Sequence, residues 1–287
     1  WWGALLWALM PLKVENVTWL SGRGDVLGWA SWVIGMLALR RARGAGPRAL
    51  LGLGATAAAL LAKETFLVAP ALLWLEVACL RRAASGARWR RTASDAALWG
   101  SALATLAYLG LRLQWVGWAR GGGAAMFEQV GVVERASLVL ESFGRALGAC
   151  AWPWAPALLR GPIGFQAPFV LAPEPLWGGV GLVGALLLLV LVLKEPKARP
   201  AVGLLVVPLL PVLNVLPTGL EARMSDRYLY LPSLGIVLGG LLALAPLWRR
   251  ARPSPSLRFV LGALVAAGLV LAVQPRVRQF THPEQLW

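Results

Sequence analysis

The chain has 287 residues, of which 58% are apolar and only 14% are charged, and its formal net charge is +15. A soluble domain carries charge on roughly a quarter of its residues, so this composition excludes an ordinary soluble protein and favours a membrane protein. No Gly-rich phosphate loop, zinc-ligand spacing or basic groove lined with aromatic residues supports nucleic-acid binding. The single histidine, His282, excludes a histidine-rich metal site and disfavours a Ser-His-Asp mechanism.

Long apolar stretches recur along the chain, and several can cross a hydrocarbon core of roughly 30 Å at 1.5 Å per residue. Inside lipid such stretches form helices, because the backbone must satisfy its own hydrogen bonds. The sixteen Trp residues also suit membrane–water boundaries. The sequence therefore predicts an all-α membrane protein, a polytopic transmembrane helix bundle. The predicted spans are 1–12, 26–39, 49–62, 65–80, 96–118, 176–193, 200–217, 231–248 and 257–273.

The basic residues gather in four connectors between these spans and predict how the chain is oriented. The connectors hold 16 of the 28 basic residues. The positive-inside rule places all four on the cytoplasmic side. Residues 119–175 must then begin and end outside; their ambiguous helix, about 136–151, either dips into the membrane within a hairpin or lies along its outer surface. The connector residues are Arg40, Arg41, Arg43 and Arg48; Arg81, Arg82, Arg88, Arg90 and Arg91; Lys194, Lys197 and Arg199; and Arg249, Arg250, Arg252 and Arg258.

Polar residues inside or beside the early spans predict local features. Spans 49–62 and 65–80 flank Lys63 and Glu64 and are expected to form a tight helical hairpin with a charged tip. Arg112 either snorkels outward or lines a cavity. Asp95 and Glu76 are interpreted as residues of the cytoplasmic interface. Both cysteines, Cys79 and Cys150, are expected to be small buried hydrophobes rather than a disulfide.

Glycines and prolines predict how the later spans pack and where they break. Small residues let helix backbones approach closely, so a glycine pair and a glycine triplet are expected at helix contacts. Three prolines should bend or break the span around Asn214. These residues are Gly235 and Gly239; Gly178, Gly181 and Gly184; and Pro208, Pro211 and Pro217.

Three clusters of mixed charge, at residues 13–25, 63–64 and 221–233, fall on the predicted outer side. They are either solvated loops with snorkelling side chains or parts of a site. A charge at the centre of a membrane helix costs at least ~2.5–3.5 kcal/mol, so such groups usually pair and mark function. Arginine and lysine can hold phosphate oxygens, and a carboxylate can orient or deprotonate a hydroxyl. The mixture suits a lipid-linked phosphate beside a polar acceptor.

At these clusters the sequence resembles a family. MPLKVENV at residues 10–17, followed by SGRGDVL at 21–27, resembles the signature HP-x-x-x-E-A-V … G-R-x-D-x-L. LAKET at 61–65 and SDRYLYLPS at 225–233 are similar to S/A-K-E-T/S and A-E-R-Y-L-Y-L-P-S. These motifs belong to membrane glycosyltransferases with tetratricopeptide repeats, relatives of the protein O-mannosyltransferases in the GT-C superfamily. The resemblance runs in order along the whole chain, and the last motif is the most specific.

The chain departs from the family pattern at three positions. Met10 and Lys13 stand where the family has histidines, and Asp226 replaces a glutamate. The resemblance implies that an acidic catalytic loop precedes Trp1, and that the end of the chain leads into a repeat domain. The expected domains are a transmembrane domain at 1–273, truncated at its N-terminus, and an extracytoplasmic lead-in at 274–287 to absent tetratricopeptide repeats.

The resemblance implies a GT-C-like bundle that transfers a hexose, such as mannose, from a polyprenyl-phosphate donor to a protein or glycan acceptor, with inversion. The active site would face the periplasm from a bacterial inner membrane. The donor would be the only cofactor-like molecule; membrane lipid would be a partner, and neither a metal site nor nucleic acid is expected. An upstream Asp would activate the acceptor, while basic residues stabilise the leaving phosphate.

Ten residues of the chain are assigned to the site. Arg23, Lys63 and Arg227 are expected near the phosphate; three carboxylates would orient these bases, and two tyrosines would line the sugar or lipid cavity. The candidate catalytic residues are Glu15, Arg23 and Asp25, and the candidate substrate-binding residues are Lys63, Glu64, Arg223, Asp226, Arg227, Tyr228 and Tyr230.

Three other classes of protein stay open. A non-catalytic scaffold or pseudo-enzyme presenting a repeat domain would fit the missing histidines. A transporter or flippase of a lipid-linked sugar should contain inverted repeats, and the sequence shows no convincing ones. Ligases and polymerases of surface polysaccharides are a nearby enzymatic alternative, for which a different outer-loop signature is expected.

Overall fold

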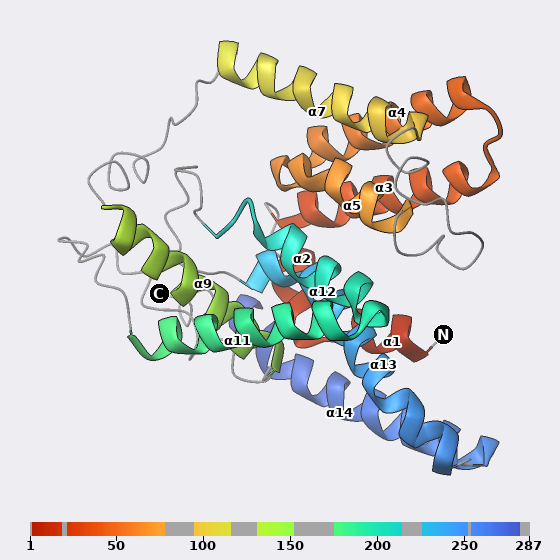
Figure 1. The fold of residues 1–287 in the computed structure, drawn as a ribbon. Coiled ribbons are helices and arrows are strands. Elements are labelled where there is room, and N and C mark those ends of the chain that lie inside the picture. Colours follow the sequence, from red (N-terminus) through yellow and green to blue (C-terminus); the bar gives the residue numbers. More distant parts are fainter. Residues whose placement is uncertain are drawn as a thin grey trace. The chain divides into compact units, whose positions relative to one another are not determined.

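The computed structural model describes residues 2–18, 22–77, 95–115, 131–151, 175–213, 226–251 and 254–281. Within these ranges the chain is helical and contains no strand (Figure 1). Five helices are long and apolar enough to cross a membrane. The predicted all-α membrane class is thereby confirmed. The five spans are α4 (Ala45–Ala62), α7 (Ala96–Trp115), α11 (Pro175–Lys194), α13 (Pro232–Ala251) and Pro255–Pro275 within α14 (Pro255–Thr281).

The chain divides into two compact units, each assembled from segments that are distant in sequence. Unit 1 comprises Trp1–Arg23, Leu140–Leu205 and Arg223–Trp287. Unit 2 comprises Gly24–Val139 and Val206–Ala222.

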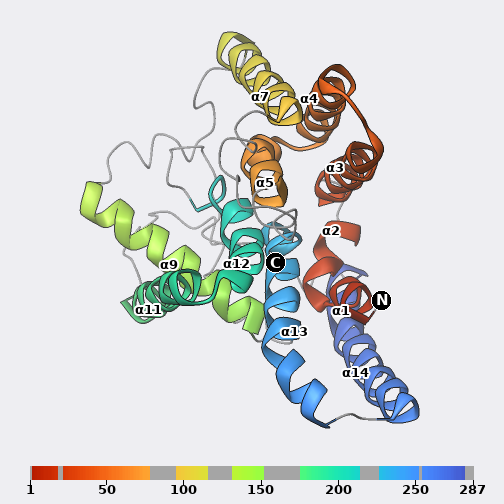
Figure 2. The ribbon, with the colours of Figure 1, turned by 45° about the vertical axis from the view of Figure 1, so that its right-hand side comes forward.

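Unit 2 is centred on α4 and α7, which lie side by side (Figures 1 and 2). Glycines allow this approach: a Cβ at Gly52 would lie 2.1 Å from the carbonyl oxygen of Ala97, and one at Gly100 would lie 2.0 Å from that of Ala49. Just beyond these contacts, toward the C-termini of both helices, the buried hydroxyls of Thr56 and Ser101 share a 2.7 Å hydrogen bond.

The remaining helices of unit 2 are α3 (Arg23–Arg41), which enters unit 2 at Gly24, the 3-10 helix Glu64–Val68, and α5 (Ala69–Leu75). The turn before α4 contains Gly44, whose φ of 87° favours glycine. After α4 the chain becomes extended at Lys63 (φ −158°) and enters the 3-10 helix. The expected tight hairpin therefore differs from the structure: α4 packs along its length on α7.

In unit 1 the short helix α1 (Trp2–Ala8) packs against both α13 and α14 (Figure 2). It is followed by the 3-10 helix Pro11–Lys13 and by α2 (Val14–Thr18). The predicted apolar span 1–12 is thus interrupted ahead of Pro11, because proline has no N–H to continue a helix.

Glycines set two close helix crossings in unit 1. Where α9 (Val132–Ala151) meets α11, a Cβ at Gly181 would lie 1.9 Å from the carbonyl oxygen of Leu140. Where α13 crosses α12 (Arg199–Val206), a Cβ at Gly235 would lie 2.5 Å from that of Ala201. Close packing is confirmed at both positions.

Of the other glycines predicted at helix contacts, one makes a close contact and two do not. Gly184 lies close to Leu147 of α9, with 2.3 Å between a hypothetical Cβ and the leucine Cδ1. An added Cβ at Gly239 would meet Ala201 at an ordinary 3.7 Å, and one at Gly178 would meet nothing within 4 Å.

Three helix ends differ from the ends of the predicted spans. The predicted span 200–217 is shortened, because α12 ends at Val206 and a 3-10 helix containing Pro208 follows. This confirms the predicted break at the prolines. Asn214 and Pro217 lie outside the described residues. α9 starts earlier than predicted, because the Glu134 carboxylate accepts the backbone N–H of Gly131 at 3.1 Å and caps its first turn. α14 continues past residue 273.

Candidate functional site

The first and third charged clusters of the sequence meet in unit 1, where α2 contacts the 3-10 helix Asp226–Leu229. The backbone N–H of Arg227 donates to the Glu15 carboxylate at 3.3 Å, and the Asn16 side-chain amide donates to the Arg227 carbonyl at 3.1 Å. Glu15 and Asn16 are buried, as is Asp226. Glu15 and Asn16, more than two hundred residues away in sequence, therefore hold both the N–H and the carbonyl of Arg227.

Lys13 lies at the centre of this cluster. Its ammonium donates to the Tyr230 carbonyl and to the Ser233 hydroxyl. It also lies 4.5 Å from the ring centroid of Trp7 and 4.6 Å from that of Tyr230. Rings at this distance attract a cation through their negative faces. Lys13 is thus enclosed by two aromatic rings and two oxygens, with 6% of its surface exposed.

Burial changes the proton affinity of two groups here. Burial lowers the pKa of the Lys13 ammonium well below its usual range, while the nearby Cys150 acts weakly in the opposite direction. Burial raises the pKa of the Cys150 thiol to about 12. Cys150 is a free, buried cysteine, as predicted for a small hydrophobe. Cys79 lies outside the described residues.

The Arg227 side chain differs from Lys13 in being partly exposed. Its guanidinium donates to the Tyr228 hydroxyl at 3.0 Å and lies 5.0 Å from the centre of that ring. The buried Tyr228 therefore supports the guanidinium, whereas Tyr230 is half-buried and contacts Lys13. Arg23, the first residue of α3, is exposed. Arg223 lies outside the described part of the chain.

Unit 2 contains the other predicted site residues. The Lys63 ammonium lies 3.7 Å from the Asp25 carboxylate, to which the Thr65 hydroxyl also donates at 3.4 Å. The start of α3 lies against the end of α4, because a Cβ at Gly24 would be 2.7 Å from the Ala62 carbonyl oxygen. The structure thus joins Asp25 and Lys63, which come from two separate motifs.

Glu64 forms an ion pair with Arg112 of α7. The two side chains are 46% and 30% exposed, so this pair lies at the edge of unit 2. Of the two predicted placements of Arg112, snorkelling and cavity lining, neither included this carboxylate partner. The 3-10 helix after Lys63 is what turns Glu64 toward α7.

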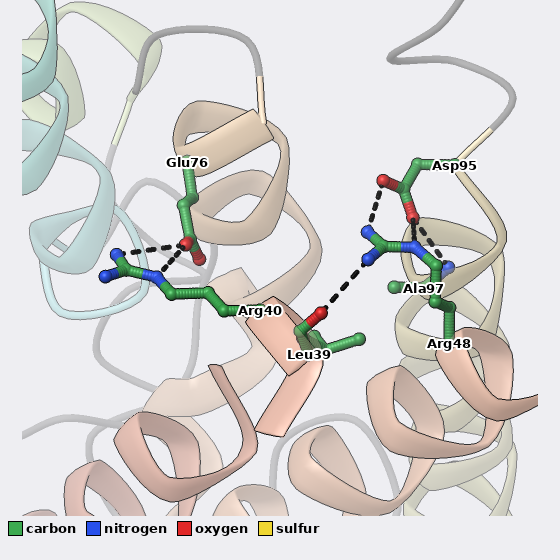
Figure 3. A network of polar contacts seen from close by, with 6 residues as sticks. All are labelled: Leu39, Arg40, Arg48, Glu76, Asp95 and Ala97. Atoms are coloured by element: carbon green, nitrogen blue, oxygen red, sulfur yellow. Dashed lines mark hydrogen bonds and ion pairs between the residues drawn. The ribbon is translucent and has the colours of Figure 1, made fainter. Parts of the chain in front are cut away.

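The opposite ends of the unit 2 helices are joined by arginines of the first basic connector (Figure 3). Arg48 donates to Asp95 at 2.6 and 3.3 Å and to the Leu39 carbonyl at 3.1 Å, and Asp95 also accepts the N–H of Ala97. One ion pair thus ties the C-terminus of α3 to the first turns of α4 and α7.

A second, more exposed pair lies beside it: Arg40 contacts Glu76 at 3.3 Å (Figure 3). Asp95 and Glu76 thus pair with arginines of the first basic connector, and their place at the cytoplasmic interface stays a prediction. Arg48–Asp95 joins the N-terminal ends of α4 and α7, and Glu64–Arg112 joins their C-terminal ends. The two helices therefore run parallel.

The sequence reasoning missed an ion pair in α9. Glu141 and Arg145, 1% and 2% exposed, form a 2.9 Å contact, and the guanidinium lies 5.5 Å from the ring centre of Trp177 in α11. The four-residue spacing of opposite charges was the signal that could have found it. Lys13, Asn16 and Ser233 lie inside the predicted charged clusters but were not among the residues assigned to the site.

Comparisons with protein-family models, curated proteins and solved structures find no match to this chain. Within the described ranges, no group of three or more His, Cys, Asp or Glu residues could hold a metal ion. The chemistry available in the two clusters is therefore that of basic side chains held by carboxylates, backbone and aromatic rings. Such groups can bind an anion, phosphate in particular.

Proposed function

We propose that this chain is the membrane part of a GT-C-like glycosyltransferase, which moves a sugar from a polyprenyl-phosphate donor to a protein or glycan acceptor on the extracytoplasmic side. One observation carries the proposal. The segments that resemble the first and last family motifs dock on each other in unit 1, where Glu15 and Asn16 hold the backbone of Arg227. A merely solvated loop would need no such buried support.

Arg227 is the residue through which unit 1 would bind the donor phosphate. A guanidinium can engage phosphate oxygens in a bidentate fork, and its charge offsets the negative charge that develops on a leaving phosphate. The acceptor hydroxyl attacks the anomeric carbon, the bond from that carbon to the phosphate oxygen breaks, and polyprenyl phosphate leaves. The acceptor proton passes to a carboxylate that acts as general base.

Lys63, in unit 2, is another basic residue that the motif resemblance assigns to the donor. Asp25 lies 3.7 Å from its ammonium and is suited to orient it. Arg23 is exposed and basic, as a residue that meets a lipid phosphate should be. Glu64 pairs with Arg112 and is assigned a supporting role in substrate binding.

The five apolar helices place the protein in a membrane. The proposal locates it in a bacterial inner membrane with the motif residues on the periplasmic side, because the basic connectors are expected in the cytoplasm. Arg41, at the end of α3, and Arg43, just after it, are exposed, as basic residues of a cytoplasmic connector would be.

The test uses the complete protein in proteoliposomes, with polyprenyl-phosphate mannose and polyprenyl-phosphate glucose as radiolabelled donors. Arg227→Ala should reduce sugar transfer by about a hundredfold, the usual effect of removing one group that stabilises developing charge. Arg41→Ala, an exposed arginine of the predicted cytoplasmic connector, is the matched control and should retain wild-type transfer.

Two outcomes would contradict the proposal. Wild-type transfer by Arg227→Ala would remove Arg227 from the site. Failure of the wild-type protein to transfer sugar from either donor, when both are presented with a bacterial membrane extract as the source of acceptor, would favour the scaffold interpretation.

A further inference from the structure

We propose that Lys13 is a positioning residue, whose ammonium holds the turn at Tyr230 and thereby fixes Arg227 for the donor phosphate. The catalytic consequence rests on the function proposed above, whereas the structural role does not. Lys13 was outside the set of residues that the motifs assign to the site. Its contacts connect it to that set.

The Tyr230 carbonyl is the point at which the turn is held. It accepts hydrogen bonds from the Lys13 ammonium, from the Trp7 indole at 3.1 Å and from the Ser233 hydroxyl at 2.9 Å. Lys13 also donates to the Ser233 hydroxyl, at the start of α13. Three donors from two distant segments thus converge on one carbonyl, and Lys13 is the only charged donor among them.

The backbone of the turn transmits this constraint to Arg227. The Tyr230 N–H donates to the Arg227 carbonyl at 3.4 Å, and Asn16 donates to the same carbonyl at 3.1 Å. Glu15 accepts the Arg227 N–H. The 3-10 turn is therefore held at one end by α2 and at the other end by Lys13. Releasing either end should let the Arg227 side chain move.

The contacts of Lys13 depend on a charged group with several donors. The Trp7 and Tyr230 rings meet edge to face, 5.1 Å apart with an interplanar angle of 70°, and both lie within cation–π distance of the ammonium. Methionine would fill nearly the same volume, but it would give neither the cation–π attraction nor the two hydrogen bonds. Lys13→Met therefore separates the charge from the packing.

A purely structural lysine is the simpler alternative, and a double-mutant cycle separates the two roles. If Lys13 acts through Arg227, Lys13→Met should reduce the kcat of transfer at least tenfold in the wild-type background and less than twofold in the Arg227→Ala background. Rates are normalised to folded protein in the membrane. Equal losses in both backgrounds would overturn the proposal. Lys197→Met, at an exposed connector lysine, is the control and should change neither background.

A second measurement does not depend on activity. Arg227→Cys is introduced with Cys79→Ser, while Cys150 is kept because only 3% of it is exposed. Adding Lys13→Met should raise the rate of alkylation by a membrane-impermeant maleimide at least fivefold, since the turn is released, and Lys197→Met should leave it unchanged. An unchanged rate with Lys13→Met would reject the positioning role.

The two arms keep the two proposals apart. Faster alkylation in a protein without transferase activity would retain the role of Lys13 and reject the proposed function. Alkylation and transfer that both stay unchanged in Lys13→Met would reject the role of Lys13 and leave the proposed function standing. If Lys13→Met does not fold, Ser233→Ala serves instead: it removes one acceptor of the ammonium, keeps the charge, and should shift both readouts in the same direction by a smaller factor.

Discussion

Lys13 and Lys63 come from two motifs of the same resemblance, yet the structure stabilises their charges differently. In unit 1, Lys13 is buried against two aromatic rings, a carbonyl and a hydroxyl. In unit 2, Lys63 faces the Asp25 carboxylate and keeps a fifth of its side chain exposed. A buried ammonium needs several partners because desolvation is costly, whereas a partly exposed one needs a single counter-charge.

The same difference recurs among the arginines. Arg145 of unit 1 lies within the helix core, between Glu141 and the Trp177 ring. The described arginine–carboxylate pairs of unit 2 instead join helix ends, as Arg48–Asp95 does. Unit 1 therefore uses charge inside its packing, where removing one partner is expensive. Unit 2 places its described pairs at helix ends, where exposure ranges from the mostly buried Arg48–Asp95 to the more exposed Glu64–Arg112.

The largest effect is expected at the buried pair of α9. Glu141→Ala should lower the free energy of unfolding by about 3–5 kcal/mol, because it removes the counter-charge of a buried arginine. Thermal unfolding in detergent micelles measures the loss. The double variant Glu141→Leu/Arg145→Met should recover most of it, since no buried charge remains; an equally unstable double variant would show that packing, and not charge, decides the effect.

Gly181, at the crossing of α9 and α11, should tolerate substitution less well than Gly178 of the same helix. Gly181→Ala places a Cβ 1.9 Å from a backbone oxygen and must push the helices apart, at a cost of about 1–3 kcal/mol. Gly178→Ala, one turn away with nothing within 4 Å, should instead be neutral or slightly stabilising, because alanine favours helix. Similar melting temperatures for the two variants would contradict this contrast.

Two neighbouring ion pairs of unit 2, Arg48–Asp95 and Arg40–Glu76, should contribute differently to stability because they are buried to different extents. Asp95→Asn weakens a bidentate contact that also caps α7, and we expect a loss of about 2 kcal/mol. Glu76→Gln affects a pair in which the Arg40 side chain is 60% exposed, and should cost about 0.5 kcal/mol or less. The same unfolding measurements compare them; a larger loss for Glu76→Gln would reverse the ranking.

The smallest effect concerns pH. Because the pKa of Lys13 is lowered on folding, the unfolded chain binds more protons between that pKa and the ordinary value of 10.5. Stability should rise with pH in this window, by at most about 1.4 kcal/mol per pH unit. The Cys150 thiol acts in the opposite sense: folding raises its pKa from 9.0 to about 12, so above about pH 9 the folded chain keeps a proton that the unfolded chain loses. The rise in stability due to Lys13 is therefore expected below about pH 9.

Lys13→Met tests the sign of this dependence. Melting temperatures are compared from pH 6 to 9. The upward slope should begin where folded Lys13 loses its proton, and the transfer and alkylation assays are run below that pH, where the ammonium is charged. The variant should lose the upward slope that Lys13 contributes, and Lys197→Met, at an exposed lysine, should keep it. A wild-type slope in Lys13→Met would assign the dependence to another group.

Composition and periodicity predicted much of the fold, because membrane helices obey local rules. An apolar stretch of sufficient length must be helical in lipid wherever it packs, so α4, α7, α11, α13 and α14 could be read directly. Proline breaks are local too, which is why the end of α12 was predictable. The interrupted α1 and the 3-10 step after Lys63 were harder, since hydropathy does not record where backbone hydrogen bonds shift from four residues to three.

The contacts of the site were only partly predictable. The motifs drew attention to the segments around Glu15 and Arg227, which contact each other in the structure, but did not predict that a carboxylate would bind a backbone N–H. Which oxygen or ring surrounds Lys13 depends on residues more than two hundred positions away. The four-residue spacing of opposite charges identifies pairs within one helix. It could therefore have predicted Glu141–Arg145 but not the contacts between distant segments.

By itself the sequence determined that the chain is helical and suited to a membrane, and which polar residues interrupt its apolar stretches. It predicted nine spans, of which the described residues show five as helices long and apolar enough to cross a membrane. Tertiary structure alone decided which helices pair through glycine, and whether a given lysine meets a carboxylate or an aromatic cage. The physical reason is one of range: transfer into lipid acts on each segment separately, whereas hydrogen bonds, ion pairs and ring contacts exist only after distant segments have met.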